Sequence, residues 1–98
     1  MSKHRRAARA DTNQAEIVAA LRQIPGVTVQ TGMDDIIVGR SGKTFWFELK
    51  TECPLKKDGT VKKGALKQSQ IKLLREWTGH YNVVWTLDQI LKDIGIGG

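Results

Sequence analysis

Apolar and polar positions recur with two different periods along the chain, and the changes of period predict its elements. Residues at the spacing of one helix face come first: Ile17, Ala20, Leu21 and Ile24. Asp11 or Thr12 can cap the start of this helix, with Gln14 three residues after Asp11, and Pro25-Gly26 ends it.

Three β-rich segments follow, over residues 27–30, 35–39 and 43–50. A short turn over residues 39–42 joins the second segment to the third, which predicts a hairpin. Along the third segment, side chains alternate between the two faces of the predicted strand. One face carries Phe45, Phe47 and Leu49, and the other carries Trp46, Glu48 and Lys50.

Residues 51–66 contain Pro54, two glycines and a run of lysines, and predict a long basic loop or an irregular hairpin. A helix is expected over Gln68 to Thr78, with Ile71, Leu74 and Trp77 on one face, and Gly79 would end it. A buried strand over residues 81–85 and a capped helix from Thr86 to Gly95 complete the order α-β-β-β-α-β-α.

Length and composition favour one small domain. The chain has 98 residues, 40% of them apolar, which is enough for a single core. No apolar run is long enough to span a membrane, and no apolar segment of a signal peptide follows the basic N-terminus. With one cysteine, Cys53, no internal disulfide can form. A reducing, cytoplasmic setting is therefore expected.

The net charge of +6 is unevenly distributed. Residues 1–10 form a basic N-terminal arm with four bases and no acid, and residues 40–72 carry nine bases against three acids. Residues 11–39 are net acidic. Two basic blocks thus flank an acidic cluster, which favours a polyanionic partner over a merely solvated surface.

The candidate chemistry lies in the predicted hairpin. Asp35 begins its first strand, Glu48 lies on its second, and Lys50 emerges on the same side as Glu48. Two carboxylates from adjacent strands can share a hard divalent cation, and an ammonium group beside them suits phosphodiester hydrolysis. The alternative is that these are ordinary surface charges on an exposed strand face.

These motifs resemble the PD-(D/E)XK nuclease superfamily, and within it the small stand-alone members of the VRR-NUC type. The resemblance rests on residues 32–38 (GMDDIIV), residues 45–50 (FWFELK) and Gln70, together with the order of elements, and it covers residues 11–94. Asp34 stands where the family has a proline. The resemblance implies a restriction-endonuclease-like α/β fold, an α-β-β-β-α-β core with a mixed central sheet and a C-terminal helix. Residues 11–98 would form this single nuclease domain.

The resemblance also implies roles for individual residues. Asp35 and Glu48 would bind Mg²⁺, which Mn²⁺ can replace, with the Leu49 carbonyl as a further ligand. Lys50 would orient the attacking water and stabilise the phosphate. Glu16 matches an acid that faces the site in many relatives, and Gln70 matches a helix glutamine near it. The alternatives are a first-turn acid for Glu16 and a solvent-facing helix residue for Gln70. Asp34 would be either an outer-shell carboxylate or a turn residue.

The expected function is a divalent-metal-dependent DNA endonuclease acting as a homodimer, with no small-molecule cofactor and no membrane partner. By family resemblance it would work in a bacterial or phage-infected cell, and branched DNA such as a four-way junction is a reasonable substrate. The expected phosphate contacts are Lys56, Lys57, Lys62, Lys63, Lys67, Arg5, Arg6 and Arg9. The alternative is a non-catalytic basic DNA-binding accessory protein. Trp46 and Trp85 are expected to pack in the core or at its edge rather than stack on bases, and His4 and His80 are expected to be structural or exposed.

Overall fold

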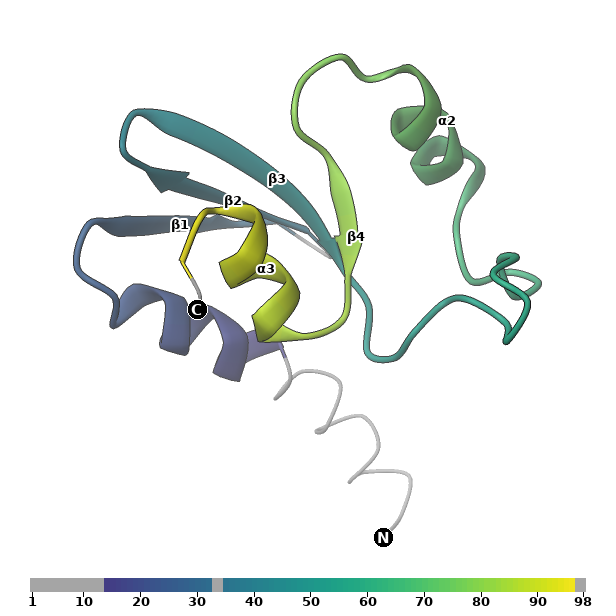
Figure 1. The fold of residues 1–98 in the computed structure, drawn as a ribbon, viewed down its shortest axis with the longest axis horizontal. Coiled ribbons are helices and arrows are strands. Elements are labelled where there is room, and N and C mark those ends of the chain that lie inside the picture. The colour runs from purple at the N-terminus through teal and green to yellow at the C-terminus, as the bar shows by residue number, and fades with distance from the viewer. Residues whose placement is uncertain (1–13, 33–34, 97–98) are drawn as a thin grey trace, which may run out of the picture.

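A four-stranded mixed sheet organises the chain, with its strands in the spatial order β1-β2-β3-β4 (Figure 1). The computed structural model describes residues 14–32 and 35–96. The strands are β1 (Val27–Thr31), β2 (Asp35–Arg40), β3 (Lys43–Leu49) and β4 (Asn82–Val84). The first three are antiparallel neighbours, and β4 runs parallel to β3. The predicted α/β class with a mixed sheet flanked by helices is confirmed.

Three helices accompany the sheet in the described part of the chain. Residues 14–22 are helical, α2 (Gln68–Glu76) lies between β3 and β4 in the chain, and α3 (Leu87–Asp93) follows β4. The predicted start of the first helix, at Asp11 or Thr12, lies outside the described residues. The predicted end of α2 at Thr78 was too late, because Trp77 adopts an extended backbone with ψ of 126°. The predicted capping box of α3 is confirmed, since the Thr86 side chain accepts a hydrogen bond from the Gln89 amide.

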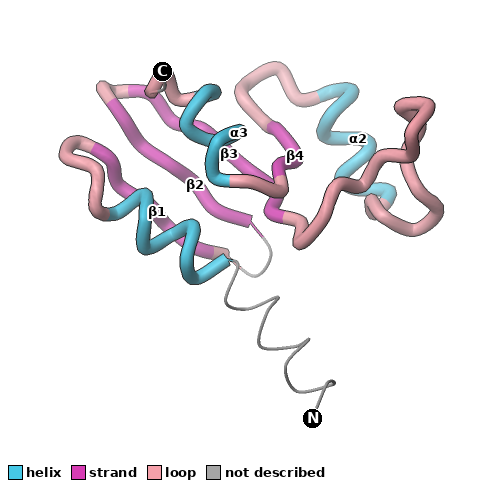
Figure 2. The backbone as a smooth tube through the Cα atoms, turned by 60° about the horizontal axis from the view of Figure 1, so that its bottom comes forward, coloured by secondary structure: helices cyan, strands magenta, loops and turns pink. Residues whose placement is uncertain are grey.

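One face of the sheet carries the core. The helix over residues 14–22 and α3 lie against this face (Figure 2). Its buried residues come from both helices and all four strands: Ile17, Val18, Leu21, Val27, Val29, Ile36, Val38, Phe47, Leu49, Val84, Ile90 and Ile94. Strand periodicity therefore places the alternate residues of β2 and β3 on the opposite side of the sheet.

That opposite side, here called the open face, bears polar, aromatic and aliphatic residues. Asp35 and Ile37 on β2 and Trp46 and Glu48 on β3 point to it, and Ile37 is 43% exposed. Helix α2 adds none of its apolar residues to the core, and Gln70 is its only buried residue. The apolar stripe that predicted α2 is thus partly in solvent, with Leu74 and Trp77 exposed.

Residues 51–67 contain an irregular hairpin, one of the two predicted alternatives. Leu55 and Val61 form an antiparallel bridge, and the Lys56 amide donates to the Thr60 carbonyl across 2.7 Å. The Asp58 carboxylate accepts hydrogen bonds from the Thr60 amide and hydroxyl, which closes the tip. Residues 55–63 are called the basic hairpin below.

No helix within residues 14–32 and 35–96 has the length and apolar composition that a membrane crossing requires.

Candidate active site

Asp35 and Glu48 face each other directly across the β2–β3 pair. Residues in this relationship project from the same face of a sheet, with their Cβ atoms about 5 Å apart. Glu48 is buried, with 6% of its surface exposed, and Asp35 is half-buried. The hairpin therefore brings together the two carboxylates that the sequence singled out.

Two other residues position the Asp35 carboxylate. The Trp46 indole Nε1–H donates a hydrogen bond of 2.9 Å to Asp35 Oδ2. The other carboxylate oxygen, Oδ1, lies over the Cα of Gly32, where the Cβ of any larger residue would collide with it. Gly32 also donates its amide to the Asp35 carbonyl across 2.8 Å. Trp46 thus holds the carboxylate on one side, and the absence of a side chain at Gly32 leaves room for it on the other.

Lys50 lies beside Glu48, with 3.9 Å between Lys50 Nζ and Glu48 Oε2. The Lys50 amide donates to the Val84 carbonyl across 2.9 Å, so pairing with β4 continues to this residue. In the planar trans peptide that joins Leu49 to Lys50, the carbonyl points opposite to that amide. The Leu49 carbonyl therefore points away from β4, toward the β2 side, as its predicted ligand role requires.

Tyr81, just before β4, is a residue of this site that sequence reasoning missed. Burial, and after it the negative charges of Glu48 and Asp35, raise the pKa of the Tyr81 hydroxyl to about 12. Its ring packs edge-on against Trp46 with centroids 4.8 Å apart. Alternation along β4 puts Tyr81 on the face of Val83, but the pairing of Val83 with Glu48 could not be read from the sequence.

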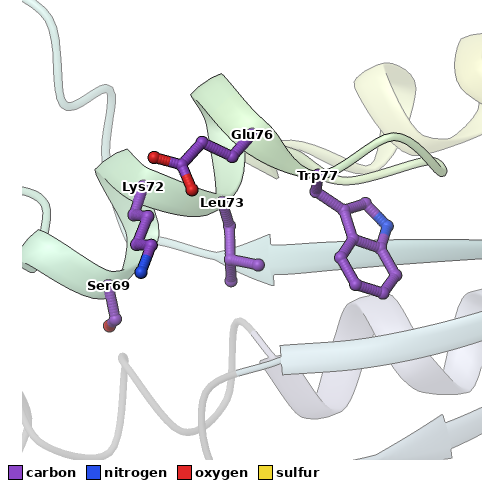
Figure 3. Close-up of a pocket in the computed structure, with 5 residues that line it drawn as sticks. All are labelled: Ser69, Lys72, Leu73, Glu76 and Trp77. Atoms are coloured by element: carbon purple, nitrogen blue, oxygen red, sulfur yellow. The ribbon is translucent and has the colours of Figure 1, made fainter.

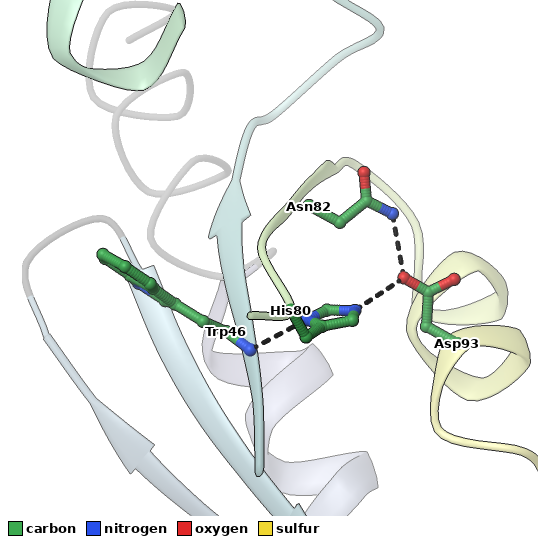
Figure 4. A network of polar contacts seen from close by, with 4 residues as sticks. All are labelled: Trp46, His80, Asn82 and Asp93. Atoms are coloured by element: carbon green, nitrogen blue, oxygen red, sulfur yellow. Dashed lines mark hydrogen bonds and ion pairs between the residues drawn. The ribbon is translucent and has the colours of Figure 1, made fainter. Parts of the chain in front are cut away.

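His80 joins the site to α3 (Figure 4). Its Nδ1 accepts a hydrogen bond of 3.1 Å from the Trp46 amide, and its Nε2 lies 3.1 Å from Asp93 Oδ2. Because Nδ1 accepts, the proton of the neutral ring is assigned to Nε2, which donates to Asp93. Asn82 donates to the same oxygen across 2.9 Å. His80 is structural, as expected, but it clamps the backbone of the tryptophan that holds Asp35.

Gln70 has a structural partner within its own helix. Its side-chain Oε1 accepts a hydrogen bond of 2.9 Å from the Lys67 amide at the start of α2. This capping contact explains why a polar side chain only 5% exposed is stable there. The sequence suggested that Gln70 either lies near the site or faces solvent, and neither role includes capping α2. Because Gln70 is buried, the solvent-facing alternative is wrong.

Glu16 is exposed on the first described helix. Within residues 14–32 and 35–96, no three His, Cys, Asp or Glu side chains are grouped closely enough to hold a metal ion. The structure therefore brings Asp35 and Glu48 together without Glu16. Asp34, the other acid of the motif, lies outside the described residues.

The lysines expected to contact phosphate are all exposed: Lys56, Lys57, Lys62, Lys63 and Lys67. A hollow of about 210 Å³ is lined by both Lys50 and Lys62, so the base of the basic hairpin adjoins the candidate site. Lys62 also pairs with Glu52 across 3.8 Å. Arg5, Arg6 and Arg9 lie outside the described residues.

No family model matches the sequence, and no curated protein or solved structure is significantly similar to it. The resemblance to PD-(D/E)XK nucleases therefore gains no support from these comparisons and stays a prediction that rests on the residues described above.

Proposed function

We propose that this protein is a divalent-metal-dependent DNA endonuclease of the PD-(D/E)XK type that hydrolyses phosphodiester bonds. The observation that carries this proposal is the direct cross-strand pairing of Asp35 with Glu48, with Lys50 beside Glu48 on the same face. A divalent cation would be stabilised between two carboxylates that face each other, one of them buried. Ordinary surface charges would instead be solvated.

The donors at this place fit Mg²⁺ or Mn²⁺. Magnesium is typically bound through one or two carboxylates and keeps several waters, so a group of three acids is not required. Asp35, Glu48 and the Leu49 carbonyl are the ligands we assign. A bound ion would supply Lewis-acid activation of water and neutralise the charge on the phosphate.

The other residues act on geometry and charge. Lys50 places a cation where the attacked phosphate gains negative charge, and it orients the nucleophilic water. Trp46 holds Asp35 in one orientation, as residues behind metal ligands commonly do, and Gly32 leaves the space that this orientation needs. We assign Gln70 to capping α2, since its buried amide oxygen is engaged there.

Exposed lysines of the basic hairpin would bind the DNA backbone next to the site, through the hollow that Lys50 and Lys62 share. A domain of 98 residues covers little of a duplex, so we propose a homodimer that presents one site to each strand. Branched DNA such as a four-way junction is the substrate that such a pair would suit.

The test is cleavage of end-labelled duplex, nicked and four-way-junction DNA with Mg²⁺, with Mn²⁺ and with chelator. Asp35→Asn, Glu48→Gln and Lys50→Gln should each abolish metal-dependent cleavage while leaving DNA binding in chelator intact. Asp88→Asn, on the exposed side of α3, is the matched control. Binding without cleavage of any substrate would favour the non-catalytic accessory protein instead.

A further inference from the structure

Trp77 is the most exposed large apolar residue of the described chain. It follows directly after α2, and 51% of its surface is accessible. Burying an indole is worth more than burying almost any other side chain, so an exposed one beside an aromatic cluster is unusual. Trp77 touches Trp46 edge-on, with ring centroids 5.4 Å apart and an interplanar angle of 86°.

The Trp77 ring borders a hollow of about 480 Å³ along α2 (Figure 3). Leu73 and Trp77 supply its apolar lining, and Ser69, Lys72 and Glu76 supply its polar lining. The hollow thus combines a cation on α2 with an aromatic ring on the residue directly after that helix. Proteins use this combination to bind single strands, because the ring stacks on a nucleobase and the cation contacts a phosphate.

Gly79 allows the indole to lie where it does. A Cβ at position 79 would come within 2.9 Å of Trp77 Nε1, closer than real Cβ contacts allow. The absence of a side chain at this residue therefore lets the Trp77 ring fold back over the backbone. The edge-on contact with Trp46 restrains the ring on one side, which lowers the entropy cost of stacking against it.

Contacts connect this hollow to the candidate metal site. Trp77 packs on Trp46, and Trp46 donates its indole hydrogen bond to Asp35. A base stacked on Trp77 would thus be separated from the Asp35 carboxylate by the Trp46 ring.

From these contacts we infer that Trp77 stacks on an unpaired base of the DNA, while Lys72 contacts the adjoining phosphate. A base inside a duplex is already covered on both faces, so only an unpaired or flipped base can reach the ring. This assignment rests on the proposed function for its neighbouring site, and it narrows the substrate to DNA with an unpaired segment, such as a junction, flap or gap.

The test measures binding in chelator, so it does not depend on cleavage. Oligo(dT) and a backbone of the same length with abasic residues are titrated against the full chain, alongside a blunt duplex. Trp77→Ala should weaken binding of oligo(dT) by roughly 5- to 150-fold. Its affinity for the abasic strand and the duplex should change less than about two-fold. Trp77→Phe, which keeps a ring, should restore most of the loss.

Two controls separate stacking from charge and folding. Leu74→Ala removes an exposed apolar side chain of α2 that lies outside the aromatic cluster, and should leave oligo(dT) affinity unchanged. Lys72→Gln should reduce the slope of log K against log salt for oligo(dT) by about 0.7. In the unmodified protein, photocrosslinking of a 5-iodouracil oligonucleotide should label Trp77, which tests the contact without a mutation.

The inference is overturned if Trp77→Ala binds oligo(dT) as tightly as the parent, or weakens the abasic strand and the duplex equally. It is also overturned if Trp77→Ala converts a dimer to a monomer in sedimentation, because the ring would then be a contact between copies. If the parent protein cleaves no substrate, but Trp77→Ala still weakens oligo(dT) binding selectively, the proposed nuclease activity is contradicted and the stacking role of Trp77 stands.

Discussion

The indole of Trp46 and the carboxylate of Asp35 form one hydrogen-bonded unit, with 2.9 Å between Nε1 and Oδ2. The two residues lie diagonally on neighbouring strands of the hairpin, since Trp46 pairs with Ile37 and Asp35 with Glu48, and both point to the open face. A residue that looks like sheet packing therefore determines where a candidate ligand points.

The variant Trp46→Phe tests this relationship. The phenyl ring would keep most of the packing against Tyr81 but could not donate to Asp35, so the carboxylate would lose its preferred orientation. We expect metal affinity or cleavage rate to fall roughly 10- to 100-fold, in the range of other residues that support metal ligands. Trp85→Phe, the control at a tryptophan outside this cluster, should have little effect on either quantity. Equal activity of Trp46→Phe and the parent would exclude the positioning role.

Gly32→Ala tests the other side of the Asp35 carboxylate, where Oδ1 lies. The added methyl would displace Asp35 Oδ1, and we expect cleavage to fall at least about 10-fold with the fold retained. Gly39→Ala is the matched control, because its methyl meets the Thr28 hydroxyl at the far end of β2. Circular dichroism and thermal melting should show similar stability losses for the two variants. Equal losses of activity would mean that the effect is a general disturbance of the hairpin.

The raised pKa of Tyr81 predicts that the stability of the fold decreases at alkaline pH. Its pKa is raised from 10.0 to about 12 by burial and by the charges of Glu48 and Asp35, so the folded state keeps the proton longer than the unfolded state. The contribution of Tyr81 to stability is therefore fully present below pH 10 and is lost as the pH rises toward about 12. Because Tyr81 is the only tyrosine, tyrosinate absorbance measures this pKa directly.

Two variants test the cause of the raised Tyr81 pKa and its effect on stability. In Glu48→Gln the tyrosinate transition should move to lower pH, since one of the nearby negative charges is gone. Tyr81→Phe should remove the excess loss of stability between pH 10 and about 12 in denaturant unfolding. A transition near the ordinary tyrosine pKa in the parent would disprove the proximity of these groups.

The hydrogen bonds that join His80 and Asn82 to Asp93 predict that losing this carboxylate lowers the stability of the fold. Asp93→Ala removes the acceptor for both His80 Nε2–H and the Asn82 amide, which are part-buried. We expect a loss of about 1–3 kcal/mol in the free energy of unfolding, measured in urea. Asp88→Ala, in the first turn of the same helix, should cost less than about 1 kcal/mol. A smaller loss for Asp93→Ala than for Asp88→Ala would show that these hydrogen bonds to Asp93 contribute nothing to the free energy of unfolding.

Much of this fold follows from local patterns. The alternation around Phe47, the turn at Gly42 and the capping box at Thr86 each predict their element, because periodicity and turn chemistry are local properties. The pairing of Asp35 with Glu48 also follows, since the short turn fixes the register of a hairpin.

Contacts between distant segments could not be predicted in the same way. Parallel pairing of β3 with β4 brings Tyr81 to the acids and His80 to the Trp46 amide, and no local pattern encodes that register. The stripe of α2 predicted a packed helix, yet α2 contributes no apolar side chain to the core and Trp77 after it stays exposed. Gln70, singled out by family resemblance, caps its helix through a contact that the spacing to Lys67 permits.

The central claim is that Asp35 and Glu48 together bind a divalent cation. Electron paramagnetic resonance of free Mn²⁺ measures this directly, by titrating the ion into the parent, Asp35→Asn, Glu48→Gln and the control Asp88→Asn. We predict a site in the parent and in the control whose affinity falls at least about 10-fold in each of the two site variants. Equal Mn²⁺ binding by all four proteins, or none by the parent, would contradict the account.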